Sequence, residues 1–250
     1  NLPSPRQRRL TSQPAQGLHP PGQPELAQRR QADALVQHLE VLVFDLAQRH
    51  DVPIDIHLHE AGELGLFSAR LVLERIQAHG LTSRVTLAHA FAFGSQLPQV
   101  AGLLDQLAEW DVALTTIAPG PREGLPILDL VTRGIRTGLG QDGQRDYWSP
   151  YGNTDMLDRT WQLAFTQGWS RDELIEHGLA VASIGGRSVL DPAAVRLTSV
   201  TDRPGVSVGD IADLVLLQGD TPTAAVMDRS GGRTVLKSGR VVAHDGELIG

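Results

Sequence analysis

The stretch RVTLAHAFAFGSQLPQVAGLLDQLAEWDVALTTIA, residues 84–118, decides the fold class of this chain. Apolar runs typical of buried strands, at 84–90 and 112–118, flank a helical pattern at 96–111. The same alternation continues outward on both sides, with further strands and helices expected at 53–57, 66–80, 125–134 and 135–143. A regular β–α–β–α order predicts a parallel sheet covered by helices, and so an α/β fold.

Polar residues stand at or just past three of these strand ends. His57, His89 and Asp142 occupy these positions. Chemistry in parallel sheets and (β/α) barrels gathers at the carboxyl ends of strands. The coincidence of three such groups predicts a site at this end of the sheet.

The segment DIHLHEAG, residues 55–62, contains the residue types that such a site needs. His57 and His59 point to the same side of a strand, because successive side chains alternate. Imidazole nitrogen binds Zn²⁺ or Fe²⁺, and Asp142 can add a carboxylate oxygen. A metal held in this way makes water nucleophilic near neutral pH. Glu60 is then placed to shuttle a proton, and His89 to polarise a carbonyl or orient the water.

Each of these residues also has an ordinary structural interpretation. A lone histidine in an apolar strand is more often a satisfied core or surface residue than a ligand. The sequence GQDG around Asp142 is good turn chemistry without a metal. Trp148 and Tyr151 could line a substrate pocket or simply pack their own loop.

The outer segments suggest three parts. Residues 1–24 are rich in Pro, Gln, Arg and Ser, and we expect a disordered tail. Residues 25–200, which open with a helical pattern at 25–50, are expected to form a partial barrel. Near the end of this partial barrel, Ser170 is the expected N-cap of a helix. Residues 201–250 alternate and turn on glycine, which predicts a small separate β-sheet.

Composition restricts the class of protein. The 250 residues carry a formal net charge of −7, which argues against nucleic acid as a partner. The sequence has no cysteine, which excludes disulfides and thiolate ligands. No apolar run approaches the roughly 20 residues that span a bilayer, so we expect no membrane partner. No apolar signal-peptide core opens the chain, and a cytoplasmic location is the expectation.

The ordered motifs resemble those of a known family. An HxxE strand, then RVTLAH, then GLGQDG with YWSPYGNTDML, then a terminal GDIADLVLL and VLKSGRVV sheet are similar to the cytosine deaminase-like branch of the metal-dependent amidohydrolases. The similarity covers about residues 35–250. It implies a (β/α)8 TIM barrel with one divalent metal, zinc or iron, and a small β-sandwich. The implied reaction is hydrolytic deamination of a cyclic amidine, or cleavage of a related ring C–N bond.

The resemblance also implies roles for individual residues. His57 and Asp142 match metal ligands, Glu60 matches the proton shuttle, and His89 matches the histidine that contacts the water or substrate carbonyl. Trp148 is the expected substrate-binding residue, for a small heterocyclic molecule.

Only the later β/α units of such a barrel are visible in the sequence, because the family's first-strand HxH has no counterpart. We therefore expect unpaired sheet edges and an uncovered inner face of Val, Ile and Leu. A homo-oligomer or a complementing chain would cover them. The alternative to an enzyme is a truncated, non-catalytic relative that needs such a chain.

Overall fold

A computed structural model describes residues 42–120, 124–147 and 150–249. The predicted tail at 1–24, the first part of the predicted helix at 25–50, and Trp148 lie outside the described residues. Residues 42–50 are helical, and the compact unit of the fold begins at Phe44. Among the described residues, no helix is both long and apolar enough to cross a membrane.

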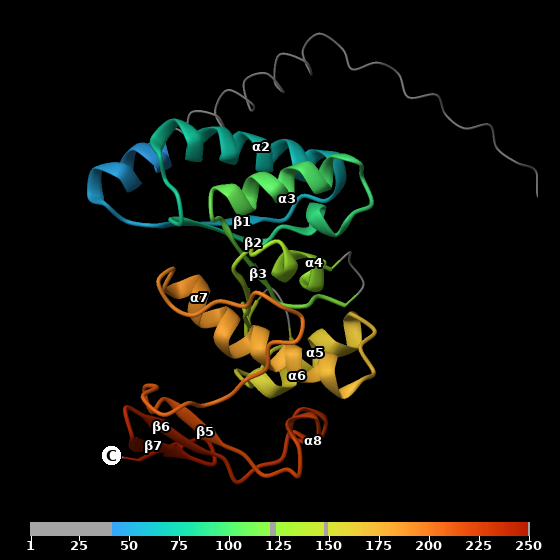
Figure 1. Cartoon of the computed structure of the whole chain (residues 1–250), viewed down its shortest axis with the longest axis vertical. Coiled ribbons are helices and arrows are strands. Elements are labelled where there is room, and N and C mark those ends of the chain that lie inside the picture. Colours follow the sequence, from blue (N-terminus) through green and yellow to red (C-terminus); the bar gives the residue numbers. More distant parts are fainter. Residues whose placement is uncertain (1–41, 121–123, 148–149, 250) are drawn as a thin grey trace, which may run out of the picture. The chain divides into compact units, whose positions relative to one another are not determined.

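Four parallel strands form the central sheet, as the alternation predicts. They are β1 (Ile54–Leu58), β2 (Val85–His89), β3 (Ala113–Thr116) and β4 (Thr137–Leu139), and they pair in the order β1-β2-β3-β4. Crossovers between parallel strands are right-handed, so a sequential order carries all the connecting helices to one face, as in a barrel wall. Within the described chain, β1 and β4 are the two edge strands of this sheet. Figure 1 labels β1, β2 and β3 in this sheet.

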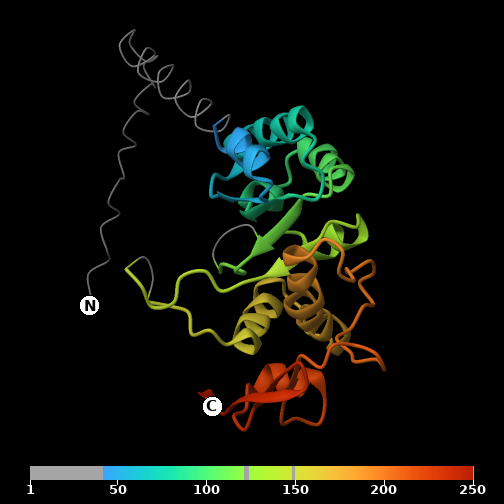
Figure 2. The ribbon, with the colours of Figure 1, turned by 90° about the vertical axis from the view of Figure 1, so that its left-hand side faces the viewer.

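The connecting helices bury apolar stripes against the sheet. They are α2 (Gly62–His79), α3 (Gln99–Glu109) and α4 (Ile127–Thr132). Figures 1 and 2 both show α2 and α3 side by side. Gly80 ends α2 with a left-handed backbone of φ 64°, which confirms it as the predicted C-cap.

The two faces of the sheet differ sharply in chemistry. Register places Ile56, Leu87 and Leu114 in one row on the face that joins the helix-covered core. The neighbouring row, His57, Ala88, Thr115 and Gly138, includes residues that line a pocket. The prediction that the open face of the sheet carries Val, Ile and Leu is therefore wrong. The branched apolar residues of β1–β3 alternate onto the helical side, and small or polar residues occupy the other.

A second group of helices follows the loop after β4. It comprises α5 (Met156–Thr166), α6 (Asp172–Ala180), a π-helical segment η2 (Val181–Gly185) and α7 (Gly186–Leu190). Asp155 caps α5 by accepting a hydrogen bond from the Leu157 N–H at 2.9 Å. The predicted Ser170 cap of α6 is wrong. Arg171 holds the N-cap position and makes no side-chain cap, because the helix begins one residue later than the sequence pattern indicates.

The last segment forms a separate antiparallel sheet, as predicted. Its strands, in the order β5-β6-β7-β8, are β5 (Leu214–Leu216), β6 (Thr234–Lys237), β7 (Arg240–His244) and β8 (Glu247–Leu248). A helix that was not predicted, α8 (Pro222–Asp228), connects β5 to β6. Arg233 donates to both carboxylate oxygens of Asp155 at 2.7 and 3.0 Å, which ties this segment to the start of α5. The domain boundary near residue 200 stays a prediction.

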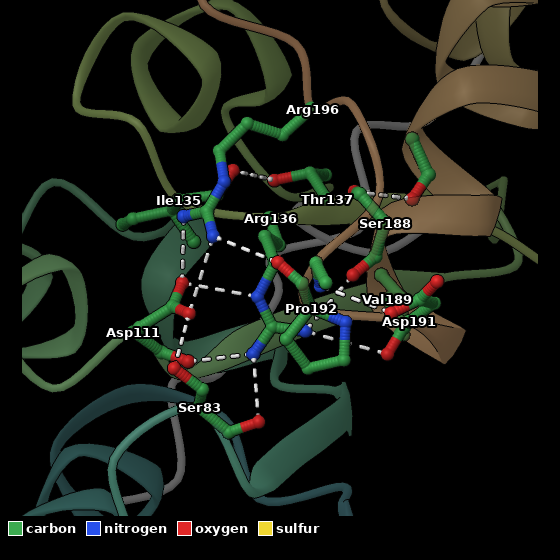
Figure 3. A network of polar contacts seen from close by, with 12 residues as sticks. Ser83, Asp111, Ile135, Arg136, Thr137, Ser188, Val189, Asp191, Pro192 and Arg196 are labelled. Carbon is green, nitrogen blue, oxygen red and sulfur yellow. Dashed lines mark hydrogen bonds and ion pairs between the residues drawn. The ribbon is translucent and has the colours of Figure 1, made fainter.

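A polar network closes the amino end of the central sheet (Figure 3). Arg136, just before β4, is 2% exposed and donates from Nε to Asp111 Oδ1 at 3.0 Å. Its Nη atoms donate to the carbonyls of Ser83 and Ser188 at 3.2 and 3.0 Å. Arg196 donates to the same Asp111 carboxylate at 2.8 and 3.3 Å. One buried guanidinium thus joins three strand starts to α7.

Candidate metal centre

Three predicted site residues converge at the opposite, carboxyl end of the sheet. His57 lies on β1, His89 ends β2, and Asp142 follows β4 by three residues. One ligand atom from each lies within 4.8 Å of the others. His89 Nε2 is 3.6 Å from Asp142 Oδ2, and the His57 and His89 ring centroids are 5.0 Å apart. Residues up to 85 positions apart in sequence therefore share one site.

Backbone conformation contributes to this convergence. Register pairs His89 with Leu58, whose side chain is buried on the helix-covered side. His89 has a left-handed backbone with φ 67°, and its ring lies beside His57 despite that register. Asp142 is also left-handed, with φ 59°. Such conformations cost about 1–3 kcal/mol each and concentrate at functional sites.

The donor set fits a zinc or iron ion. Ligand atoms held at about 2.1 Å in a tetrahedral arrangement lie about 3.4 Å apart. The observed ligand atoms lie within 4.8 Å of one another, a somewhat wider spacing. The His57 side chain is 58% exposed and that of Asp142 is 40% exposed, so both can rotate. The His57 imidazole and the Asp142 carboxylate are chemically suitable ligands for either metal, and His89 adds a second imidazole beside them.

Two further groups surround the histidines. The His59 ring lies 4.4 Å from that of His89 and 5.9 Å from that of His57. His57 and His59 thus face the same neighbour, as their alternation predicts. Asp55 Oδ1 lies 3.9 Å from His57 Nδ1, beyond hydrogen-bonding distance. Sequence reasoning missed Asp55, although its position two residues before His57 puts it on the same face of the strand.

A small pocket opens beside these groups. Its volume is about 150 Å³, and Asp55, His57, His89 and Asp142 line it together with Ala88, Thr115, Thr116, Ile117 and Gly140. The Thr116 hydroxyl accepts a hydrogen bond from the Ala118 N–H at 3.0 Å and so fixes the turn after β3. The pocket therefore has a polar wall built on strand ends.

Glu60 is exposed and lies two residues past β1, outside the group of three ligand atoms. Its backbone carbonyl packs so tightly on Gly65 that a Cβ there would overlap it. The start of α2 therefore fixes the backbone of Glu60 and leaves its side chain in solvent. Trp148, the predicted substrate-binding residue, lies outside the described residues.

Sequence reasoning also missed a buried cation. Arg159 on α5 is 7% exposed and contacts Gln141, the residue before Asp142. Burial lowers the pKa of Arg159, whereas the nearby Asp158 and Asp142 carboxylates raise it. The sequence does contain a signal for Arg159, because this arginine stands between the buried Leu157 and Leu163 of an amphipathic helix.

Fold and site together define an α/β protein with a candidate metal-binding group at the carboxyl ends of parallel strands. The chain belongs to the amidohydrolase family, whose sequence model matches residues 12–243. The resemblance to the cytosine deaminase-like branch is thereby confirmed at the level of family and fold.

Curated and solved relatives agree with this assignment. The N-isopropylammelide isopropyl amidohydrolase of Pseudomonas sp. (strain ADP) is 28% identical over 209 residues, which are 83% of this chain and 50% of that protein. The crystal structure of N-isopropylammelide isopropylaminohydrolase from Burkholderia multivorans ATCC 17616 is 33% identical, with a TM-score of 0.75 over 85% of this chain and 53% of that one.

A more distant structure shares the fold. The 5-methylcytosine deaminase of Klebsiella pneumoniae, liganded with 5-fluorocytosine, is 19% identical, with a TM-score of 0.67 over 86% of this chain and 53% of that one. The chain spans about half the length of the relatives that it matches.

Proposed function

We propose that this chain belongs to a metal-dependent hydrolase that removes an amine or ammonia from a nitrogen heterocycle with a cyclic amidine group. The convergence of His57, His89 and Asp142 at neighbouring strand ends carries this proposal. The names of the relatives support the reaction class, because they include an isopropylaminohydrolase and a deaminase of such rings.

Each residue has a role in this reaction. His57 and Asp142 hold the divalent ion, which when bound supplies the Lewis acidity that makes water nucleophilic near neutral pH. Glu60 accepts a proton from the attacking water and delivers it to the leaving nitrogen. His89 hydrogen-bonds the water or a ring carbonyl, from a buried position beside Asp142. The 150 Å³ pocket beside them receives the reacting edge of the ring.

Metal content of the purified chain is the first test. We expect near-stoichiometric zinc or iron, lost in Asp142→Ala and retained in the matched variant Asp105→Ala on the outer helix α3. Asp105 pairs with Arg133, and neither residue belongs to the pocket lining or to the group of candidate ligands. Metal that persists undiminished in Asp142→Ala would contradict the assigned ligand set.

Activity is the second test, with N-isopropylammelide, cytosine and 5-methylcytosine as probes and amine or ammonia release as the signal. Glu60→Gln should lower kcat by about 10²–10⁴-fold, the usual contribution of a proton-transfer group. Glu63→Gln, three residues away in the first turn of α2, should leave kcat unchanged. Equal activity of the two variants would remove the role of Glu60.

A second possibility is that the chain acts only with another copy or a complementing chain. The observation that favours it is that β1 and β4 end the described sheet, and open sheet edges invite pairing. Size-exclusion chromatography with light scattering, run beside the activity measurement, separates the two cases. An active monomer contradicts the need for a partner.

A further inference from the structure

The Arg159 guanidinium is buried and contacts the segments that follow β3 and β4. Its Nη1 donates to the Ile117 carbonyl at 2.9 Å and to Gln162 Oε1 at 3.0 Å. Its Nη2 donates to Gln141 Oε1 at 2.8 Å. A buried cation is stable only when it is hydrogen-bonded and near compensating charge, so these contacts fix its position.

The two glutamines extend the network to the backbone. Gln141 Nε2 donates to the Asp155 carbonyl at 2.8 Å, and Gln162 Nε2 donates to the Ala118 carbonyl at 2.8 Å. Arg159 therefore links three segments: the turn after β3, the turn after β4 and the start of α5. We call Arg159, Gln141 and Gln162 the α5 clamp.

The clamp acts on residues that form the site. Ile117 lines the pocket, and Gln141 is bonded directly to Asp142 in the chain. Ala118 and Asp142 both have left-handed backbones, with φ 52° and 59°. Non-glycine residues keep such conformations only where the surroundings over-determine them, and the clamp holds both turns.

The charges of Arg159 and Asp142 also support a link between the clamp and the site. The Asp142 carboxylate is close enough to Arg159 to oppose the pKa decrease that burial causes in the guanidinium. A cation on that side favours one orientation of the carboxylate over others.

We propose that Arg159 is a positioning residue for the candidate metal centre, acting through Gln141 on the orientation of Asp142. This inference rests on the proposed function, because it assumes that Asp142 is a ligand. Groups that orient a metal ligand typically change metal affinity by roughly 10–100-fold when they are removed. A purely structural arginine would change stability alone.

The test uses Co²⁺ as the probe, titrated into the full chain and followed by its visible absorption. The variants are Arg159→Met, Arg159→Lys and Gln141→Leu. Gln167→Leu is the matched control, because Gln167 is a half-buried glutamine that donates to the Leu125 carbonyl and lies outside the clamp. Thermal unfolding of each protein reports on folding.

We expect Arg159→Met and Gln141→Leu to bind Co²⁺ roughly 10–100-fold more weakly, with altered band positions. Arg159→Lys should bind Co²⁺ with an affinity between those of Arg159→Met and the unmodified chain, because lysine keeps the charge but lacks the planar set of donors of the guanidinium. Gln167→Leu should bind as the unmodified chain does. Gln141→Leu remains informative if Arg159→Met does not fold.

Two results would overturn the inference. If the unmodified chain binds Co²⁺ and Gln141→Leu binds it equally tightly, the clamp does not position Asp142, and the proposed function survives. If the unmodified chain binds no Co²⁺, the proposed function fails and the inference fails with it.

Discussion

The two ends of the central sheet each contain a buried arginine, but they differ in what surrounds it. At the amino end, Arg136 and Arg196 meet the half-buried Asp111, so that opposite charges pair directly. At the carboxyl end, Arg159 donates to neutral oxygens of Ile117, Gln162 and Gln141, and the nearby Asp142 is exposed. The amino end is thus built for stability, whereas the carboxyl end leaves polar groups available for a ligand.

The largest expected effect is on Arg136. Arg136→Met should lower the free energy of unfolding by about 3–5 kcal/mol, because it strands the Asp111 carboxylate in a partly buried site. Urea denaturation measures the loss. Arg133→Met is the control, since Arg133 pairs with Asp129 at a more exposed position and should cost no more than about 1 kcal/mol. Similar losses in the two variants would break the contrast between the sheet ends.

A glycine near the carboxyl end should produce the next largest effect. Gly65→Ala places a Cβ against the Glu60 carbonyl and the Ala92 side chain, and should cost about 1–3 kcal/mol. Gly102→Ala in α3 meets nothing within 4 Å, and should leave the protein unchanged or up to about 1 kcal/mol more stable. Thermal unfolding of both proteins would measure this. A neutral Gly65→Ala would mean that the Glu60 segment moves freely.

Acid should weaken the polar network at the amino end of the sheet. Burial raises the pKa of Asp111, but hydrogen bonds from Ser83, Arg196 and Arg136 outweigh it, and the pKa lies below its usual value. The stabilisation is therefore complete above about pH 4, the unfolded pKa, and is lost as pH falls through the lowered folded pKa. Urea midpoints between pH 2.5 and 6 test this.

Asp111→Asn is the comparison for that titration. It should be less stable at neutral pH, and its midpoint should depend less on pH below 4. An unchanged acid dependence in Asp111→Asn would assign the effect to other carboxylates, such as Asp155. Burial raises the pKa of Asp155, but Arg233 and the hydrogen bond from the Leu157 N–H together outweigh it, and that pKa is also lowered.

The smallest effect on stability is expected at the site itself. His57→Ala should change the free energy of unfolding by no more than about 0.5 kcal/mol, because its side chain is 58% exposed. The same substitution should abolish the Co²⁺ absorption. Paired urea and Co²⁺ titrations would therefore separate stability from metal binding, and a large loss of stability would contradict the division between the sheet ends.

The sequence allowed the strands, the Gly80 cap and the grouping of His57, His89 and Asp142 to be predicted, because these depend on local periodicity and on strand ends that meet at one edge. The face of the sheet that bears the apolar residues was predicted wrongly, since a continuous apolar run does not show which side is covered.

Helix α8 was missed although Thr221 and Pro222 form a helix start, with the Thr221 hydroxyl accepting from the Ala224 N–H. Arg159 acts through contacts with Ile117 and Gln141, 42 and 18 residues away, which periodicity does not report. Asp55 was overlooked although strand alternation places it on the same face as His57.

The reach of Arg196 has a consequence for folding. Arg196 lies 85 residues beyond the Asp111 carboxylate that it pairs with, and Arg136 bonds the Ser188 carbonyl 52 residues later. Contacts of such sequence separation raise contact order and form late. On the ribosome, all four strands emerge before the residues that close their amino ends. The nascent sheet therefore passes through a stage in which the polar network at its amino end has not formed. At that stage, chaperone binding and pairing of the strands with other chains compete with folding.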